Sequence, residues 1–176
     1  MMLTEHFSLA ELTKSQMAER MGLDNSPSEV QVSNLSRLCE NILEPTRENY
    51  GIPFSPSSCF RSSTLNDIVG GASNSQHVDG CAADIEISGV DNLELARWIE
   101  RNLSYDQLIL EHHVLGDAAS GWVHVSYRFD FNRMQSLRFD GTSYLRGLTE
   151  PRYRSLAFSL LNTVRDCFAK ITGRNK

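Results

Sequence analysis

Three side chains able to bind a metal stand at informative positions in this sequence. His77 and Asp84 are seven residues apart, with Gly80 between them to permit a turn. His124 follows forty residues after Asp84, inside the apolar run 122–127. Two histidines and one carboxylate can hold a catalytic Zn²⁺ with a position open to water, and the same set suits non-heme Fe(II). Residue types alone also allow a surface histidine, a strand-end cap and a hydrogen-bonded core histidine.

The elements that must position these side chains are short strand-like runs separated by small polar residues. The candidate strands are Ser57–Phe60, Ala82–Ile87, Gln107–Glu111 and Trp122–Tyr127. A loop rich in Gly, Ala and Ser joins the last two, which predicts an antiparallel hairpin. Asp84 and His124 are therefore expected on strands, and His77 on the loop before the second strand.

Helices are predicted on both sides of this strand region. Capping boxes occur at Ser8/Glu11, Ser28/Gln31 and Asp91/Glu94, and each marks a helix start. The first helix should end near Met21–Gly22, and the second should end or kink at Pro45. A last helix is indicated after Thr149, where an apolar stripe keeps a helical period. We predict an α+β fold, a small, mainly antiparallel sheet flanked by N- and C-terminal helices.

Length and composition limit the classes of function. The chain has 176 residues, 40% of them hydrophobic, which suits one domain with a genuine core. A net charge of −5 opposes attraction to nucleic acid or anionic lipid, so we expect neither nucleic-acid binding nor membrane insertion. Four scattered cysteines without a C-x-x-C pair are expected to be reduced and mostly buried. The acidic start lacks the apolar stretch of a signal peptide, so we expect synthesis in the cytoplasm.

Several motifs in one order resemble a known family. The segment Ser75–Asp84 reads S-Q-H-x-x-G-x-A-x-D, and W-V-H-V-S follows at 122–126; Phe60-Arg61-Ser62 precedes them and Asp106–Ile109 lies between. This pattern resembles the zinc D-alanyl-D-alanine carboxypeptidase family, which shares its fold with phage peptidoglycan endopeptidases and the Hedgehog signalling domain. The resemblance implies a zinc peptidase core over residues 1–127 and a C-terminal extension, 128–176, packed on the same domain.

The resemblance also implies roles for particular residues. His77, Asp84 and His124 match the ligands of one Zn²⁺ per chain, and the implied reaction is amide hydrolysis. Many relatives place the water-activating base three residues before the last histidine, but here that position is Gly121. Glu111 is the best remaining catalytic base, because an antiparallel hairpin would turn it toward the face of His124. His112, His113 and the absence of any functional base remain alternatives.

Three further residues are candidates for contact with the substrate. In the family that the sequence resembles, an arginine in this Phe-Arg-Ser context faces the site. The resemblance therefore implies that Arg61 binds a substrate carboxylate or stabilises the oxyanion, and so counts as both catalytic and substrate-binding. Ser75 either hydrogen-bonds near the substrate or caps a turn. Gln107 either binds substrate or supports a ligand histidine. We expect Cys81, Trp122 and Tyr127 to serve as packing or pocket wall, rather than as a ligand or a platform for sugars.

Two functions of different classes follow. The first is a monomeric zinc carboxypeptidase or endopeptidase acting on peptidoglycan peptides. The missing leader suits a phage-type lysis or virion enzyme that reaches the wall by holin-type release or particle entry. The second is a non-catalytic zinc-binding module of the same fold, which the glycine at position 121 favours. An Fe(II) oxygenase fits the ligands but not the surrounding motifs.

Overall fold

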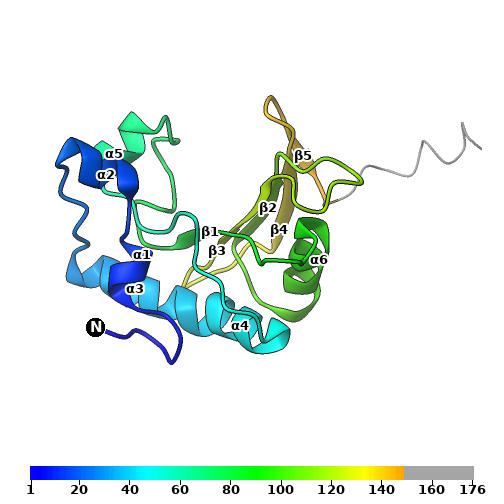
Figure 1. Cartoon of the computed structure of the whole chain (residues 1–176), viewed down its shortest axis with the longest axis horizontal. Helices are drawn as coiled ribbons and strands as arrows, with labels where there is room; N and C mark the ends of the chain where they lie inside the picture. Colours follow the sequence, from blue (N-terminus) through cyan, green and yellow to red (C-terminus); the bar gives the residue numbers. More distant parts are fainter. Residues whose placement is uncertain (149–176) are drawn as a thin grey trace, which may run out of the picture.

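A five-stranded sheet with helices packed below it forms the centre of the molecule in the computed structural model, which describes residues 1–148 (Figure 1). The strands are β1 (Ala82–Ile85), β2 (Gln107–Glu111), β3 (Trp122–Ser126), β4 (Gln135–Phe139) and β5 (Tyr144–Arg146). The helices are α1 (Leu9–Leu12), α2 (Gln16–Met21), α3 (Glu29–Leu38), the π-helical η1 (Cys39–Leu43), α4 (Glu44–Tyr50), α5 (Ser63–Ile68) and α6 (Asn92–Asn102). Over these residues, no helix combines the length and hydropathy needed to cross a bilayer.

The sheet has the order β1-β3-β2-β4-β5. Every neighbouring pair is antiparallel except β2 and β4, which run parallel. The predicted α+β class, the mainly antiparallel sheet and the β2–β3 hairpin are therefore confirmed. The parallel pair is possible because the chain leaves β3 through an irregular segment, 127–134, before it returns beside β2.

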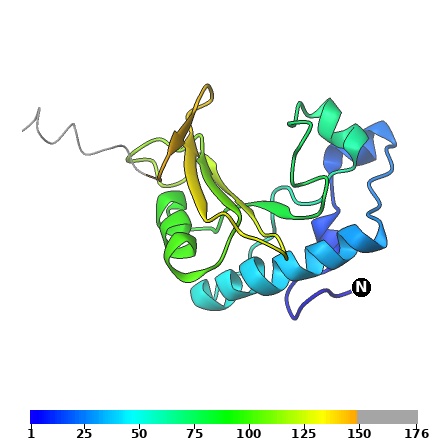
Figure 2. The same ribbon diagram turned by 180° about the vertical axis from the view of Figure 1, so that it is seen from behind.

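The two faces of the sheet have different chemistry because side chains alternate along each strand. One face carries aliphatic residues that join the core with α3, η1 and α6: Ala83, Ile85, Leu108, Leu110, Val123 and Val125. These six side chains are at most 2% exposed. Figure 2 shows the helices on this side of the sheet from behind. The opposite face carries Asp84, His124 and Glu111, and it is the face that lines a cleft.

Of the two outcomes predicted at Pro45, an end or a kink, the end is wrong, because the long helix beneath the sheet passes through this residue. The π turn of η1 lies immediately before it, and the backbone N–H of Glu44 donates to the carbonyl of Cys39. This turn shifts the hydrogen-bond register ahead of the proline, which has no N–H to contribute. Beyond it, the hydroxyl of Thr46 donates to the carbonyl of Ile42 at 2.6 Å, and the helix continues as α4.

Two other expectations need correction. The N-terminal helix is in fact two helices, because Ser15 caps α2 separately, and Gly22 then ends α2 with φ 64°. Residues 57–60 form no strand beyond a single bridge between Ser58 and Asp84. The backbone N–H of Phe60 donates to the carbonyl of Leu12 and not to β1, so the pairing goes no further.

The sheet extends beyond the motif region. Strands β4 and β5 add residues 135–139 and 144–146 to it, and no element is predicted there from sequence. Both strands are short and little buried: β4 reads Q-S-L-R-F with Leu137 alone buried, and all of β5 is exposed. The helix predicted after Thr149 lies outside the described residues, and the boundary at residue 127 stays a prediction.

Gly121 enters β3 at a point where the backbone cannot accept a side chain. Its φ is 66°, and an added Cβ would lie 1.9 Å from the carbonyl oxygen of Glu111. We predict that Gly121→Ala lowers the free energy of unfolding by more than about 3 kcal/mol. Gly89→Ala, where φ is 79° with no atom within 4 Å of the added Cβ, should cost only about 1 kcal/mol. Equal shifts of the two urea-unfolding midpoints would contradict the steric argument.

Candidate metal centre

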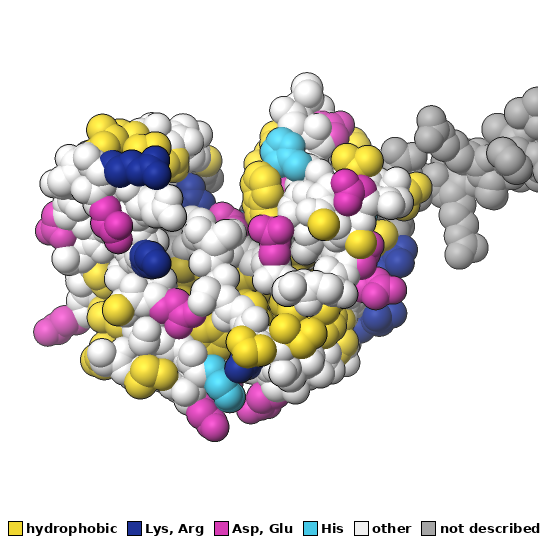
Figure 3. Space-filling model, in the orientation of Figure 1, with side chains coloured by type: hydrophobic (Ala, Val, Ile, Leu, Met, Phe, Trp, Pro, Cys, Tyr) yellow, Lys and Arg dark blue, Asp and Glu magenta, His cyan; other side chains and the backbone are white. Residues whose placement is uncertain are grey.

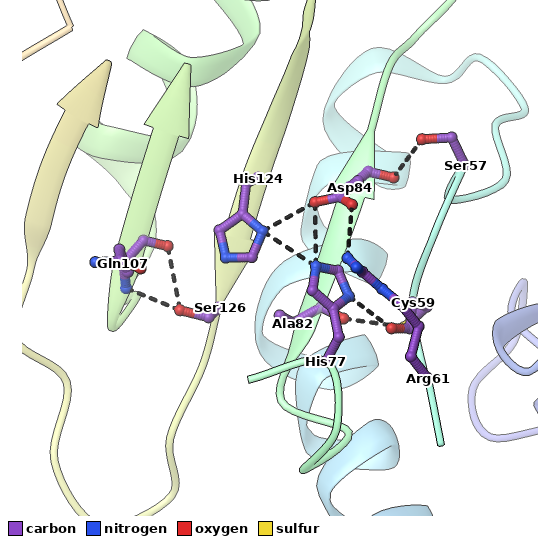
Figure 4. A network of polar contacts seen from close by, with 9 residues as sticks. All are labelled: Ser57, Cys59, Arg61, His77, Ala82, Asp84, Gln107, His124 and Ser126. Atoms are coloured by element: carbon purple, nitrogen blue, oxygen red, sulfur yellow. Dashed lines mark hydrogen bonds and ion pairs between the residues drawn. The ribbon is translucent and has the colours of Figure 1, made fainter. Parts of the chain in front are cut away.

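Neighbouring strands and one loop bring the three predicted ligands together (Figure 4). Asp84 on β1 stands directly opposite His124 on β3, and opposed residues share a face of the sheet. Nδ1 of His124 lies 2.9 Å from Oδ1 of Asp84. Nε2 of His77, from the loop before β1, lies 3.2 Å from the same His124 nitrogen and 3.3 Å from the Asp84 oxygen. Three potential donor atoms thus converge on one point.

This geometry fits a zinc ion. Bonds of about 2.0–2.1 Å in a tetrahedral site separate neighbouring donor atoms by about 3.3–3.4 Å. The three separations here, 2.9, 3.2 and 3.3 Å, are close to that value. All three residues are at least nine-tenths buried. Within residues 1–148, three protein ligands converge at this point, and such a set leaves a position for water or substrate, as catalytic zinc sites do.

A backbone carbonyl orients His77. Its Nδ1 lies 2.6 Å from the carbonyl oxygen of Cys59, an acceptor that requires the proton on Nδ1. Nε2 then presents its lone pair toward Asp84 and His124. Such an outer contact sets the tautomer and ring orientation of a metal-ligating histidine. This role of Cys59 could not be predicted from sequence, because a contact made by a backbone carbonyl leaves no signal in residue type.

The charges of these groups suit a cation. Burial lowers the pKa of His77, an effect that the nearby Asp84 carboxylate only partly opposes. Burial alone would raise the pKa of Asp84, but its interactions with His77 and His124 outweigh burial and hold the pKa well below its usual range. A neutral imidazole and an ionised carboxylate are the protonation states that bind metal.

Helix α3 fixes the loop that carries His77. Gly80 packs so closely on α3 that an added Cβ would lie 2.8 Å from the carbonyl oxygen of Gln31. The side-chain amide of Gln31 donates to the carbonyl of Val78 at 2.8 Å, and that of Asn34 donates to the carbonyl of Asp79 at 2.9 Å. From sequence, Gln31 is expected only to cap a helix. Its contact with the His77 loop could not be predicted, because the contacts of Gln31 and Asn34 join residues more than forty positions apart.

A buried carboxylate ties the same loop to the other side of the sheet. Asp106 is fully buried and accepts a hydrogen bond from Nε2 of Gln76 at 3.0 Å. The guanidinium of Arg133 donates two hydrogen bonds to the Asp106 carboxylate, from Nε at 2.9 Å and from Nη2 at 2.6 Å. Burial would raise the pKa of Asp106, but the bonds from Arg133 and Gln76 outweigh it and lower the pKa. The residue beside His77 is thereby anchored to the start of β2.

Glu111 lies on the face of the metal centre, one row along the sheet. It pairs with Trp122, while His124 pairs with Ile109, so Glu111 and His124 are diagonal neighbours on one face. Burial raises the pKa of Glu111, with His124 acting in the opposite direction. The close contact between Gly121 and the Glu111 backbone explains why position 121 carries no acid. The role of Glu111 as the base remains a prediction.

The two histidines after Glu111 lie in different surroundings. His112 lines the cleft together with Glu111. Its ring lies 5.1 Å from the ring of Trp122 and 5.3 Å from that of Phe139, measured between centroids. His113 is not among the residues lining the cleft, and its Nδ1 lies 3.4 Å from the carbonyl oxygen of Ser120. Of these two rivals to Glu111, only His112 has access to the cleft.

Arg61 reaches the metal centre from the segment beside β1. Its Nη2 lies 3.3 Å from Oδ2 of Asp84, and its Nε is buried without a hydrogen-bond partner among the described residues. Such a donor is costly to leave unpaired, which is consistent with a ligand completing it. Arg61 therefore approaches the ligand carboxylate from the side opposite to His124.

The structure places the other two predicted substrate contacts, Ser75 and Gln107, in the cleft and gives each of them partners within the chain. Ser75 and Gln107 both line the cleft, so substrate binding by them stays a prediction. Gln107 donates its side-chain amide to Gln135 at 2.9 Å, whereas the carbonyl that orients His77 comes from Cys59. Ser75 accepts from the Val78 N–H through its backbone carbonyl and so begins the turn that leads into His77.

The metal centre lies in an open cleft of about 2080 Å³. Figure 3 shows the hollow between the part built from α1, α2 and α5 and the raised end of the sheet. Its walls include residues from both parts, among them Lys14, Phe60, Gln107 and Tyr144. The cleft is large enough to admit a peptide rather than only a small molecule.

A family model described as Peptidase M15 matches residues 5–126. The chain belongs to this family. The match contains all three candidate ligands, Arg61 and Glu111, and it ends at the last residue of β3. No curated protein matches the chain. M15 peptidases are zinc-dependent, and the site of His77, Asp84 and His124 supplies a suitable place for the ion in this member.

Removal of one ligand tests the metal centre directly. We predict that His77→Ala and His124→Ala each weaken zinc affinity by at least about 100-fold, since even an outer contact contributes 10–100-fold. Competition with a chromophoric chelator would measure the affinity, and elemental analysis of the full chain would give the zinc content. His113→Ala is the matched control and should keep the wild-type affinity. Undiminished binding in both ligand variants would place the zinc elsewhere.

The Asp106 anchor makes a pH-dependent contribution to stability. Because its pKa is lowered from 3.8, the stabilisation is present above that value and is lost as pH falls through the folded-state pKa. We predict that Asp106→Asn lowers the free energy of unfolding by about 2 kcal/mol near neutral pH. The difference in unfolding free energy between Asp106→Asn and wild type should become smaller below about pH 4. Urea unfolding at a series of pH values would measure it, with the exposed Asp67→Asn as control.

Proposed function

We propose that this M15 family member is a zinc-dependent peptidase that hydrolyses amide bonds in peptidoglycan stem peptides or their crosslinks. The observation that carries the proposal is the convergence of His77, Asp84 and His124 on one point in an open cleft. The family match supports peptidase chemistry, and the cleft suits a peptide substrate. Within this proposal, a phage-type lysis or virion enzyme remains the expected cellular role.

The residues around the metal centre divide the reaction between them. A bound zinc ion would polarise the substrate carbonyl and lower the pKa of a water molecule. The Glu111 carboxylate takes the proton from the attacking water as its oxygen bonds to the carbonyl carbon. The same carboxyl then delivers that proton to the amide nitrogen as the C–N bond breaks. Burial, which raises the pKa of Glu111, suits a group that must both accept and return a proton.

Arg61 supplies the positive charge that the developing oxyanion requires. Its unpaired Nε offers a donor that is not used within the described chain, while Nη2 is directed at Asp84. A fixed guanidinium in a site shielded from water stabilises negative charge more strongly than an exposed one does. The same group could instead receive a free carboxylate at the end of the substrate.

A second candidate is a zinc-binding module without catalytic activity. The observation that favours it is Gly121, which occupies the position where relatives often carry the base. The steric contact with Glu111 excludes any side chain there, so catalysis must depend on a residue elsewhere. The two candidates therefore differ in whether Glu111 moves a proton.

Substitution of Glu111 separates the two functions. We predict that Glu111→Gln lowers kcat by about 100- to 10,000-fold, the usual contribution of a general base, while zinc content stays at the wild-type level. Mass spectrometry of muropeptides released from purified sacculi would measure the new termini. His113→Ala, outside the cleft, should remain active. A zinc-loaded wild type that releases no termini would instead support the non-catalytic module.

A further inference from the structure

A row of aromatic rings crosses the sheet beside the metal centre. Trp122 of β3, Phe139 of β4 and Tyr144 of β5 occupy one cross-strand row that also contains Glu111. Cross-strand partners point to the same face, so the row lies on the face of the metal centre. We call the rings of Trp122, His112, Phe139 and Tyr144 the aromatic shelf.

The rings of the shelf contact one another in sequence. The centroid of Trp122 lies 5.1 Å from that of His112, and His112 lies 5.3 Å from Phe139. Phe139 stacks on Tyr144 at 4.5 Å with an interplanar angle of 26°. With strands about 4.8 Å apart, the row spans about 14 Å from β3 to β5. The shelf is therefore a continuous strip of aromatic rings.

An unusual backbone conformation places His112 in this strip. Consecutive residues of a strand normally point to opposite faces, yet the ring of His112 contacts two rings on the Glu111 face. His112 adopts φ 54°, a left-handed conformation that is costly for a residue with a side chain. Such local strain is concentrated at functional sites. Gly121, also left-handed, allows the close approach of the two strands at this turn.

The shelf is open to the cleft. His112, Trp122 and Tyr144 line it, and Tyr144 is 59% exposed. In the order of the sheet, the shelf extends from β3 to β5, whereas Arg61 lies beyond β1. The metal centre thus separates a cationic end of the cleft from an aromatic end.

We propose that the aromatic shelf binds a pyranose ring of the glycan to which the peptide substrate is attached. For Trp122 this departs from the sequence expectation of pocket wall alone, because its ring is the first of a row of four rings rather than an isolated aromatic. A pyranose presents C–H groups on its faces and hydroxyls at its rim. The C–H groups match the negative faces of aromatic rings, and the hydroxyls can bond to the polar tips of Tyr144 and His112. The neighbouring Glu111 carboxylate disfavours an acidic side chain there and permits a neutral sugar.

The orientation expected for the peptide substrate in the cleft agrees with this assignment. This step rests on the proposed function. A stem peptide is joined to its glycan through its N-terminal end, so a carboxylate bound at Arg61 places the glycan side toward the shelf. The shelf would then favour substrates that still carry their sugars over free peptides. This preference adds a specificity determinant outside the reacting groups.

The test compares two substrates with the same scissile bond, a stem peptide carrying its disaccharide and the matching sugar-free peptide. The measured quantity is kcat/KM for the disaccharide-bearing peptide divided by kcat/KM for the sugar-free peptide. In the zinc-loaded full chain, we expect Tyr144→Ala and His112→Asn each to lower this ratio by about tenfold. Asparagine is chosen because it tolerates a left-handed backbone. Phe129→Ala is the matched control, 72% exposed and not part of the cleft wall, and should keep the wild-type ratio.

An unchanged ratio in both variants would overturn the shelf proposal while leaving the peptidase proposal intact. Equal losses on both substrates would also overturn it, since the shelf would then bind peptide.

If the wild type hydrolyses neither substrate, binding decides the question. The chain has two tryptophans, so Trp98→Phe leaves Trp122 as the fluorescent reporter on the shelf. Titration with the disaccharide alone should quench this fluorescence, and Tyr144→Ala should weaken the apparent affinity about tenfold. That result would retain the shelf and reject the peptidase function. Absence of quenching in a protein without hydrolytic activity would reject both.

Discussion

The carboxylate of Asp84 is the group on which the metal centre depends. It is buried between two histidines and an arginine, with one oxygen 2.9 Å from His124 and the other 3.3 Å from Arg61. A buried carboxylate is tolerated only when its partners compensate for lost hydration. The backbone of Asp84 also bridges to Ser58, so the segment leading to Arg61 is fixed against the same residue. The ligand set and the candidate oxyanion donor are consequently held by one strand.

The division of the sheet into two chemically distinct faces makes this arrangement possible. Alternate residues of β1, β2 and β3 bury aliphatic side chains against the helices, and the residues between them face the cleft. A shift of one residue between β1 and β3 would send Asp84 into the core. The hydrophobic face therefore specifies the register that aligns Asp84 with His124. Stability and metal binding are properties of the same strand pairing.

Long-range polar contacts complete the positioning. Gln31 and Asn34 of α3 hold the backbone of the loop after His77, and Asp106 with Arg133 holds Gln76 before it. The loop that presents His77 is thus fixed from two sides. Rigid positioning of this kind matters because a metal site tolerates only small errors in donor placement.

Much of the candidate site could be predicted from sequence because its signals are local. The spacing of His77, Gly80 and Asp84, the W-V-H-V-S strand and the hairpin with Glu111 each lie within a short segment. The α+β class followed equally from capping boxes and alternating runs. Strands β4 and β5 could not be predicted, because both are short and little buried, and β4 pairs in parallel with a strand that lies more than twenty residues earlier. The same holds for the carbonyl of Cys59 beside His77 and for the Asp106–Arg133 pair.

The sequence by itself determined which side chains can bind a metal and which strands carry them, since residue type and alternation are encoded locally. The hairpin predicted that Glu111 shares a face with His124, but only the folded register set the two one row apart. Tertiary structure alone decided that Gly121 excludes a base at its own position. It also decided that His112, Phe139 and Tyr144 line up beside the metal centre. The physical reason is that strand register and parallel pairing arise from contacts between distant segments, and no local pattern specifies them.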